Sequence, residues 1–281
     1  MPRPSMAELI HVDGMQVVRL SNAEASAEVY LYGAHVTSYV RRGVPKLFLS
    51  DLAALDGSAP IRGGIPVCFP QFGKRGPMAV QHGFARRVVW ELGGALDAAT
   101  PSVVLRLPPG EHADWDYRLG CLLKVALEVD GTLVCHMTVH NEESERACSF
   151  STALHAYFCT PDIEKTRISG LQGTTYIDQL AGGAVVEEYP DKVEFLSEVD
   201  RIYSGVPSKI MIECGDNLVS ELELETFCDA IVWNPHVEKS RGMADLPDDA
   251  WKGFVCVEPA VAVQPVVLGA GEHWAAILRI R

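Results

Sequence analysis

A histidine at position 155 could carry out acid–base chemistry, because imidazole is the side chain that gains or loses a proton near neutral pH. In FSTALHAYF (150–158), a two-residue period puts Ser151, Ala153, His155 and Tyr157 on one strand face. Most side chains on that face are small or polar, which suits the wall of a cleft into which an imidazole projects. Taken alone, a single strand histidine is more often a hydrogen-bonded, partly buried residue, so a catalytic role requires a partner.

A carboxylate could be that partner. Glu258 comes near the end of FVCVEP (254–259), on the same predicted strand face as Phe254 and Cys256. Apolar neighbours raise the pKa of a carboxyl group toward the range of a general base. Because Pro259 cannot donate to a strand ladder, we expect the strand to stop there. The alternative is a solvated carboxylate at a strand end.

A basic segment could bind an anion. From Arg62 to Arg87 the chain has five basic residues and no Asp or Glu, although its net charge is −13. A small anionic ligand needs such an acid-free surface, since an acidic surround would repel it. The alternative is a chance cluster on a solvated face. The basic residues are Arg62, Lys74, Arg75, Arg86 and Arg87.

Two loop segments carry these charges. IRGGIPVCFPQFG (61–73) combines glycines, which allow a close approach to a ligand, with prolines that stiffen the loop. Two guanidinium groups could grip phosphate oxygens in bidentate fashion. The alternative is an ordinary loop with salt-bridged arginines. QHGFARR (81–87) adds the polar candidates Gln81, His82 and Arg86.

Other catalytic motifs are missing from the sequence. It contains no GxSxG, GxGxxG, GxxxxGK[ST] or HExxH motif. His136 and His140 fall on one strand face, but no third ligand follows at a workable spacing, so we predict no metal site.

The segments that must position these residues are short, and apolar and polar residues alternate along them. Asp130-Gly131 predicts a tight hairpin between two of them, and the best helix start, with Pro247 and two acids, lies in LPDDAW (246–251). Many strands and few helices predict an all-β fold, a large antiparallel β-sandwich or barrel, in one domain over 1–281. The predicted strands are 15–20, 27–32, 102–107, 124–129, 132–139, 209–214, 218–224 and 274–280.

Composition narrows the class of protein. A hydrophobic fraction of 48% with 22% charged residues is typical of a globular chain, and no apolar run is long enough to span a membrane. The net charge argues against nucleic acid and anionic membranes as partners. Eight cysteines without a CxxC pair, together with an N-terminus that lacks a signal-peptide pattern, indicate the cytoplasm.

Taken together, several segments resemble the glucose-6-phosphate 1-epimerases, which are hexose-6-phosphate mutarotases of the galactose-mutarotase-like superfamily. The resemblance runs from about residue 33 to residue 260. It rests on RGGIPVCFPQFG, QHGFAR, LHAYF, GLQGTTYIDQL, SEVDRIY, VWNP and MADLPDDAWKGFVCVEP. Two positions depart from the pattern, Ala156 and Ala270, and neither touches a proposed catalytic group.

The resemblance implies a β-supersandwich and a mechanism without metal or cofactor. It implies that His155 and Glu258 are catalytic. By the same resemblance, the substrate and phosphate contacts are Arg62, Gln81, Arg86 and Asp200, with His82 as a second active-site histidine.

The implied reaction exchanges the α and β anomers of a hexose phosphate. Glu258 would act as general base on the C1 hydroxyl and His155 as general acid on the ring oxygen, with Arg62 and Arg86 on the phosphate. We expect a monomer whose only partner is this small molecule. Two alternatives stay open: an epimerase of unphosphorylated aldoses, and a non-catalytic carbohydrate-binding protein of the same fold.

Overall fold

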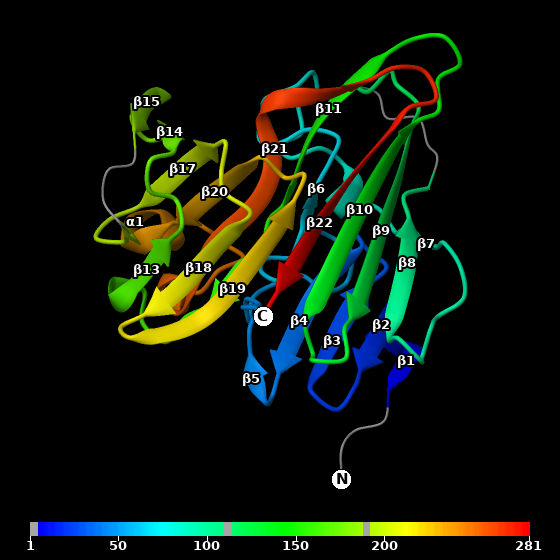
Figure 1. Ribbon diagram of the computed structural model, residues 1–281. Helices are drawn as coiled ribbons and strands as arrows, with labels where there is room; N and C mark the ends of the chain where they lie inside the picture. Colours follow the sequence, from blue (N-terminus) through cyan, green and yellow to red (C-terminus); the bar gives the residue numbers. More distant parts are fainter. Residues whose placement is uncertain (1–4, 109–113, 188–191) are drawn as a thin grey trace.

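Three antiparallel β-sheets make up most of the protein (Figure 1). The computed structural model describes residues 5–108, 114–187 and 192–281. Within these ranges, no helix is long and apolar enough to cross a membrane. The helical segments are η1 (Ala85–Arg87), η2 (Ile163–Lys165), α1 (His236–Arg241) and η3 (Ala250–Gly253).

The N-terminal sheet is a five-stranded meander in the order β1-β2-β3-β4-β5. Its strands follow one another through tight turns, as expected for antiparallel neighbours. They are β1 (Met6–Val12), β2 (Met15–Ser21), β3 (Ala25–Tyr30), β4 (His35–Arg41) and β5 (Val44–Pro45).

The second sheet has nine strands in the order β16-β13-β18-β19-β22-β10-β9-β8-β7. In Figure 1 its long strands β8, β9, β10 and β22 run side by side. Its members are β7 (Glu91–Leu92), β8 (Ser102–Arg106), β9 (Leu119–Leu127), β10 (Leu133–Asn141), β13 (Thr166–Ser169), β16 (Lys192–Glu194), β18 (Lys209–Cys214), β19 (Asn217–Glu225) and β22 (His273–Ile280).

The third sheet has eight strands. Seven follow the order β15-β14-β17-β20-β21-β11-β6, and β12 pairs separately with β21. The strands are β6 (Val67–Cys68), β11 (Cys148–Leu154), β12 (Tyr157–Cys159), β14 (Thr175–Asp178), β15 (Ala184–Glu187), β17 (Val199–Ser204), β20 (Asp229–Asn234) and β21 (Phe254–Leu268).

Alternating side chains explain how these sheets pack. Along β10, Cys135 and Met137 are buried while His136 and His140 face outward. Buried side chains of all three sheets, such as Val18, Leu123 and Val257, join one hydrophobic cluster. The predicted all-β sandwich fold is therefore confirmed, and each of the eight predicted strands overlaps an observed strand. The single domain over 1–281 stays a prediction.

Two local predictions were confirmed only in part. Asp130 and Gly131 do form the turn between β9 and β10, with Gly131 at a φ of 86°. The helical turn expected over 246–251 begins later, as η3, while the α-helix α1 precedes it and was not predicted.

The expectation that a strand stops at Pro259 was wrong. β21 continues from Phe254 to Leu268, and Pro259 pairs with Ala230 of β20 inside it. A proline removes one backbone donor but leaves its carbonyl and extended backbone available, so pairing on both sides carries the strand through. Glu258 therefore lies in a strand interior, opposite Ile231.

The loop that enters the third sheet is fixed by backbone contacts. The N–H groups of His155 and Tyr157 donate to the carbonyls of Pro66 and Gly64, each over 2.9 Å. Gly64 has a φ of 61°, and a Cβ atom there would lie 2.2 Å from the Val36 carbonyl oxygen. Only glycine can bring this loop so close to β4.

Replacing Gly64 by alanine should lower the free energy of unfolding by about 3 kcal/mol, because it adds both left-handed strain and a backbone clash. Gly205→Ala is the matched control, since Gly205 has a φ of 65° and a Cβ atom added there would meet no other atom within 4 Å. That control should lose only about 1 kcal/mol. Urea denaturation measures both values, and equal losses would contradict the close-approach argument.

Candidate active site

One cavity of about 440 Å³ collects six of the seven predicted site residues. Its floor is one face of the third sheet, where Ile231 lies opposite Glu258 and Asp200 opposite Trp233. The other face of the same strands, including Val257, belongs to the main hydrophobic core. The predicted residues that line the cavity are Arg62, Gln81, His82, His155, Asp200 and Glu258.

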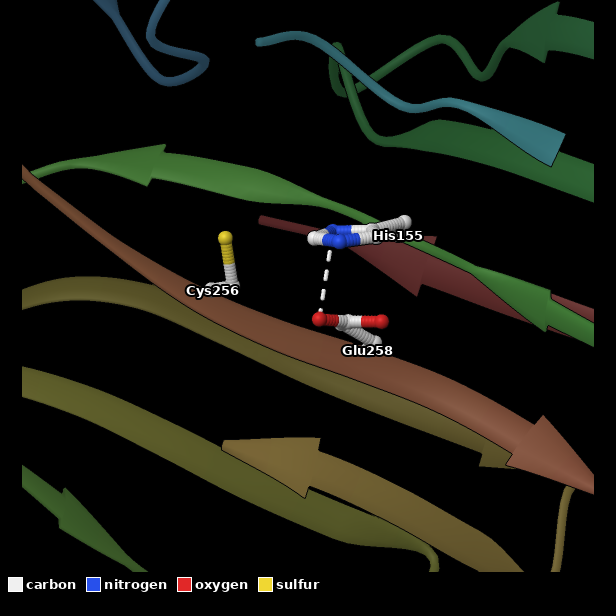
Figure 2. A group of neighbouring side chains, drawn as sticks. All are labelled: His155, Cys256 and Glu258. Atoms are coloured by element: carbon white, nitrogen blue, oxygen red, sulfur yellow. Dashed lines mark ion pairs between the residues drawn. The ribbon is translucent and has the colours of Figure 1, made fainter. Parts of the chain in front are cut away.

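His155 and Glu258 meet inside this cavity. His155 follows the end of β11, Glu258 lies on β21, and Nδ1 is 3.1 Å from Oε1 (Figure 2). The two residues are only 8% and 1% exposed. The contact is not aligned as a hydrogen bond, because His155 Nδ1 and Glu258 Oε2 are buried atoms without a hydrogen-bond partner among the described residues. Buried polar atoms without partners are uncommon in folded proteins, and a catalytic role is one explanation for them.

Burial sets the protonation of this pair. It lowers the pKa of His155 well below its usual value, and the nearby positive charges of Arg86 and Arg62 act in the same direction. Burial also raises the pKa of Glu258 well above its usual value, with Asp200 adding repulsion. Both groups thus favour their neutral forms. A neutral Glu258–His155 pair and a carboxylate–imidazolium pair contain the same number of protons. They differ only in whether one proton is on the carboxyl group or on the imidazole.

His82 is a neutral hydrogen-bonding group. The Gly73 N–H donates to its Nδ1 over 3.1 Å, and its Nε2 lies 3.1 Å from the amide nitrogen Nε2 of Gln81. Burial, with smaller effects from Arg86 and Arg62, lowers the pKa of His82 to about 3. The ring is packed edge-on against His155, with 5.7 Å between the centroids.

The two predicted phosphate-binding arginines differ in their surroundings. Arg62 is partly buried; its Nη1 donates to the Tyr157 hydroxyl over 2.8 Å, and its Nη2 is paired with Asp245 at 3.0 Å. Arg86 is not among the residues that line the cavity. Its Nη2 donates to the Gln81 carbonyl over 3.1 Å, and its buried Nε has no hydrogen-bond partner among the described residues.

Asp200 reaches the cavity from β17. Its Oδ1 accepts a 2.5 Å hydrogen bond from Gln179, and burial raises its pKa. Sequence reasoning missed Gln179, Trp233 and Lys239 as cavity residues, although the first two lie in the segments that carry the resemblance. Lys74 also lines the cavity, and it was noted only as part of the basic segment.

A metal ion does not suit the residues around the pair. Donor atoms of His155, Cys256 and Glu258 lie within 4.8 Å of one another, and their types match those found in zinc sites. However, burial raises the pKa of the Cys256 thiol well above its usual value, so the thiolate that binds metals is disfavoured. The charges of Arg62 and Arg86 also oppose a cation here. The site fits acid–base chemistry better.

A fold of three antiparallel sheets and a buried carboxyl–imidazole pair in a cavity define the class of protein. The chain matches the aldose 1-epimerase family over residues 16–281, and it belongs to that family. Its class of activity is therefore that of an epimerase of sugars, a mutarotase.

Individual relatives agree with this class. A protein of Cenchrus ciliaris provisionally named glucose-6-phosphate 1-epimerase is 37% identical over 98% of this chain and 87% of its own. A protein of Escherichia coli K12 with the same provisional name is 29% identical over 96% of this chain and 92% of its own.

Solved structures show the same fold. The crystal structure of YeaD from Salmonella typhimurium, provisionally assigned as a mutarotase, superposes with a TM-score of 0.84 at 24% identity, covering 100% of this chain and 96% of that one. Galactose 1-epimerase from Lactobacillus acidophilus gives a TM-score of 0.73 at 13% identity, covering 98% of each chain.

The raised pKa of Glu258 predicts a pH-dependent stability. Its contribution is present below the pKa of the unfolded chain and is lost as the pH rises through the folded pKa. Glu258→Gln keeps the shape without the charge, so at alkaline pH we expect it to exceed the wild type in free energy of unfolding by about 1 kcal/mol or more.

That difference should shrink as the pH falls below the usual pKa of a carboxyl group. His155 has the opposite dependence, losing stability as the pH falls, but it is present in both proteins. Urea titrations at several pH values measure the difference. A gap that stays constant with pH, or a less stable variant at alkaline pH, would contradict the assignment.

Proposed function

We propose that the protein is a hexose-6-phosphate mutarotase that interconverts the α and β anomers of glucose 6-phosphate. The observation that carries this proposal is the buried contact of 3.1 Å between His155 and Glu258 at the wall of a cavity that Arg62 also lines. A proton donor and a proton acceptor in contact with one cavity are what ring opening and closure require.

The proposed ring opening uses three proton transfers, one within the Glu258–His155 pair and two with the sugar. After a proton passes from Glu258 to His155, the carboxylate removes the proton of the C1 hydroxyl, and the C1–O5 bond breaks as a C1 carbonyl forms. The imidazolium gives its proton to O5. Rotation about C1–C2 presents the other face of the aldehyde, and ring closure reverses both transfers. Each group contributes about 10²–10⁴-fold to the rate.

The phosphate takes no part in these transfers. Its proposed contacts are Arg62 and Arg86, and the unpartnered buried Nε of Arg86 supports a role in binding an acceptor. Lys74 adds a positive charge to that of Arg62 at the cavity wall. Binding energy from the phosphate would hold the sugar in place while C1 turns.

The substrate proposal has support beyond the cavity. The relatives in Cenchrus ciliaris and E. coli carry the provisional name glucose-6-phosphate 1-epimerase. Gln81, His82 and Asp200 are the proposed partners of the sugar hydroxyls. We further propose a monomer in the cytoplasm, where the eight free cysteines would stay reduced.

Pure α-glucose 6-phosphate mixed with the protein separates the proposal from its alternatives. Faster approach to anomeric equilibrium with this sugar than with galactose supports the proposal. Faster equilibration of galactose alone supports an aldose epimerase, and acceleration of neither sugar supports a carbohydrate-binding protein.

Removing either member of the pair should abolish turnover. Glu258→Gln and His155→Asn should each lower the rate of anomer exchange by at least about 10²-fold, since each eliminates one of the two proton transfers. Magnetisation-transfer NMR of glucose 6-phosphate measures the exchange. Circular dichroism shows whether each variant is folded, and near-wild-type exchange in a folded variant would disprove the role of that residue.

Arg62 should decide between phosphorylated and free sugars. Arg62→Met keeps most of the unbranched stem of the side chain and removes the charged guanidinium group, so the KM for glucose 6-phosphate should rise by about 10–100-fold while turnover of free glucose is unchanged. Arg87→Ala is the control, because Arg87 belongs to the same basic segment but is exposed and does not line the cavity. Equal effects of Arg62→Met on both sugars would rule out a phosphate contact.

A further inference from the structure

Tyr157 touches the proposed acid and the proposed phosphate-binding group at the same time. Its ring is stacked on His155, with 4.8 Å between the centroids and 7° between the planes. Its hydroxyl accepts the 2.8 Å hydrogen bond from Nη1 of Arg62. Its strand, β12, pairs with β21 so that Tyr157 lies opposite Cys256, two residues before Glu258. Tyr157 therefore contacts His155 and Arg62 through its side chain and the strand of Glu258 through its backbone.

The backbone of Tyr157 is held rigidly. Its N–H donates to Gly64 over 2.9 Å, and its carbonyl accepts from Phe48 over 3.0 Å. The ring is only 1% exposed and packs against Phe254 and Trp233, with centroids 5.3 Å and 6.0 Å away. A side chain fixed in this way can define the position of a neighbour.

The hydroxyl of Tyr157 makes a hydrogen bond to Arg62, which the packing of the ring does not require. Burial raises the pKa of Tyr157, so the phenol stays protonated and accepts from Arg62 as a neutral group. Arg62 is then held from two sides, by Tyr157 and by Asp245. A guanidinium group that is oriented before the ligand arrives binds an anion with less loss of freedom.

We propose that Tyr157 is a positioning residue that fixes the guanidinium of Arg62 and the imidazole of His155 relative to one another, so that a bound anion and the acid keep a set separation. The hydroxyl of Tyr157 fixes the guanidinium of Arg62, and its ring fixes the imidazole of His155. This proposal rests on the proposed function, because it assigns Arg62 to the phosphate and His155 to the ring oxygen.

Two substitutions separate the tasks. Tyr157→Phe keeps the stacked ring and removes the acceptor for Arg62, so the KM for glucose 6-phosphate should rise about tenfold, with kcat within about twofold and turnover of free glucose unchanged. Tyr157→Leu removes the ring, so kcat should fall at least about tenfold for both sugars.

Tyr39→Phe is the matched control. It removes another buried hydroxyl, one that donates to the carbonyls of Gly131 and Ile280, and Tyr39 does not line the cavity. This control should lose stability without changing KM or kcat. Thermal unfolding followed by circular dichroism compares the stability of the three variants.

The outcomes decide the proposal. A wild-type protein that fails to exchange glucose 6-phosphate anomers overturns the proposed function itself. With an active wild type, an unchanged or lowered KM in Tyr157→Phe, or equal effects on both sugars, overturns the positioning role. If Tyr157→Leu does not fold, the split between KM and kcat in Tyr157→Phe decides alone.

Discussion

The structure depends on keeping a carboxyl group and an imidazole in contact where almost no water reaches them. Charged groups are costly to bury, so Glu258 and His155 both favour their neutral forms, with 3.1 Å between Nδ1 and Oε1. Becoming a carboxylate and an imidazolium therefore costs this pair free energy, which hydrogen bonds from a bound sugar would offset. The burial that makes the pair reactive is also a local loss of stability, which the rest of the sandwich must offset.

The sandwich offsets this loss because one face of the third sheet packs into the hydrophobic core while the other face lines the cavity. On β20 and β21, Val232 and Val257 point into the main core, while Ile231 and Glu258 point into the cavity. The apolar face holds the strands in place, and the alternation of the strand delivers the polar groups to the other side at fixed spacing. The segment 61–73 adds Arg62, Phe72 and Gly73 to the lining of the cavity, and Gly64 lets it approach β4.

The fold could be predicted from the sequence, and six of the seven predicted site residues line one cavity. Alternation in segments such as 132–139 predicted strands, and the resemblance to the glucose-6-phosphate 1-epimerases singled out His155 and Glu258 as a pair. Long-range pairing was not predictable: Pro259 seemed to end a strand that neighbours on both sides in fact continue. The single strand predicted over 150–158 is in fact interrupted at His155 and Ala156, between β11 and β12. The contact of Tyr157 with Arg62 joins residues 95 positions apart, which no local pattern reveals.

The most direct test of the central claim is a crystal structure of the protein with glucose 6-phosphate. The account predicts that the sugar lies in the cavity, with its C1 hydroxyl beside Glu258 and its ring oxygen beside His155. The phosphate should lie at the side where Arg62 is found. A sugar bound elsewhere, or one in the cavity with its phosphate rather than its C1 end at Glu258 and His155, would contradict the account.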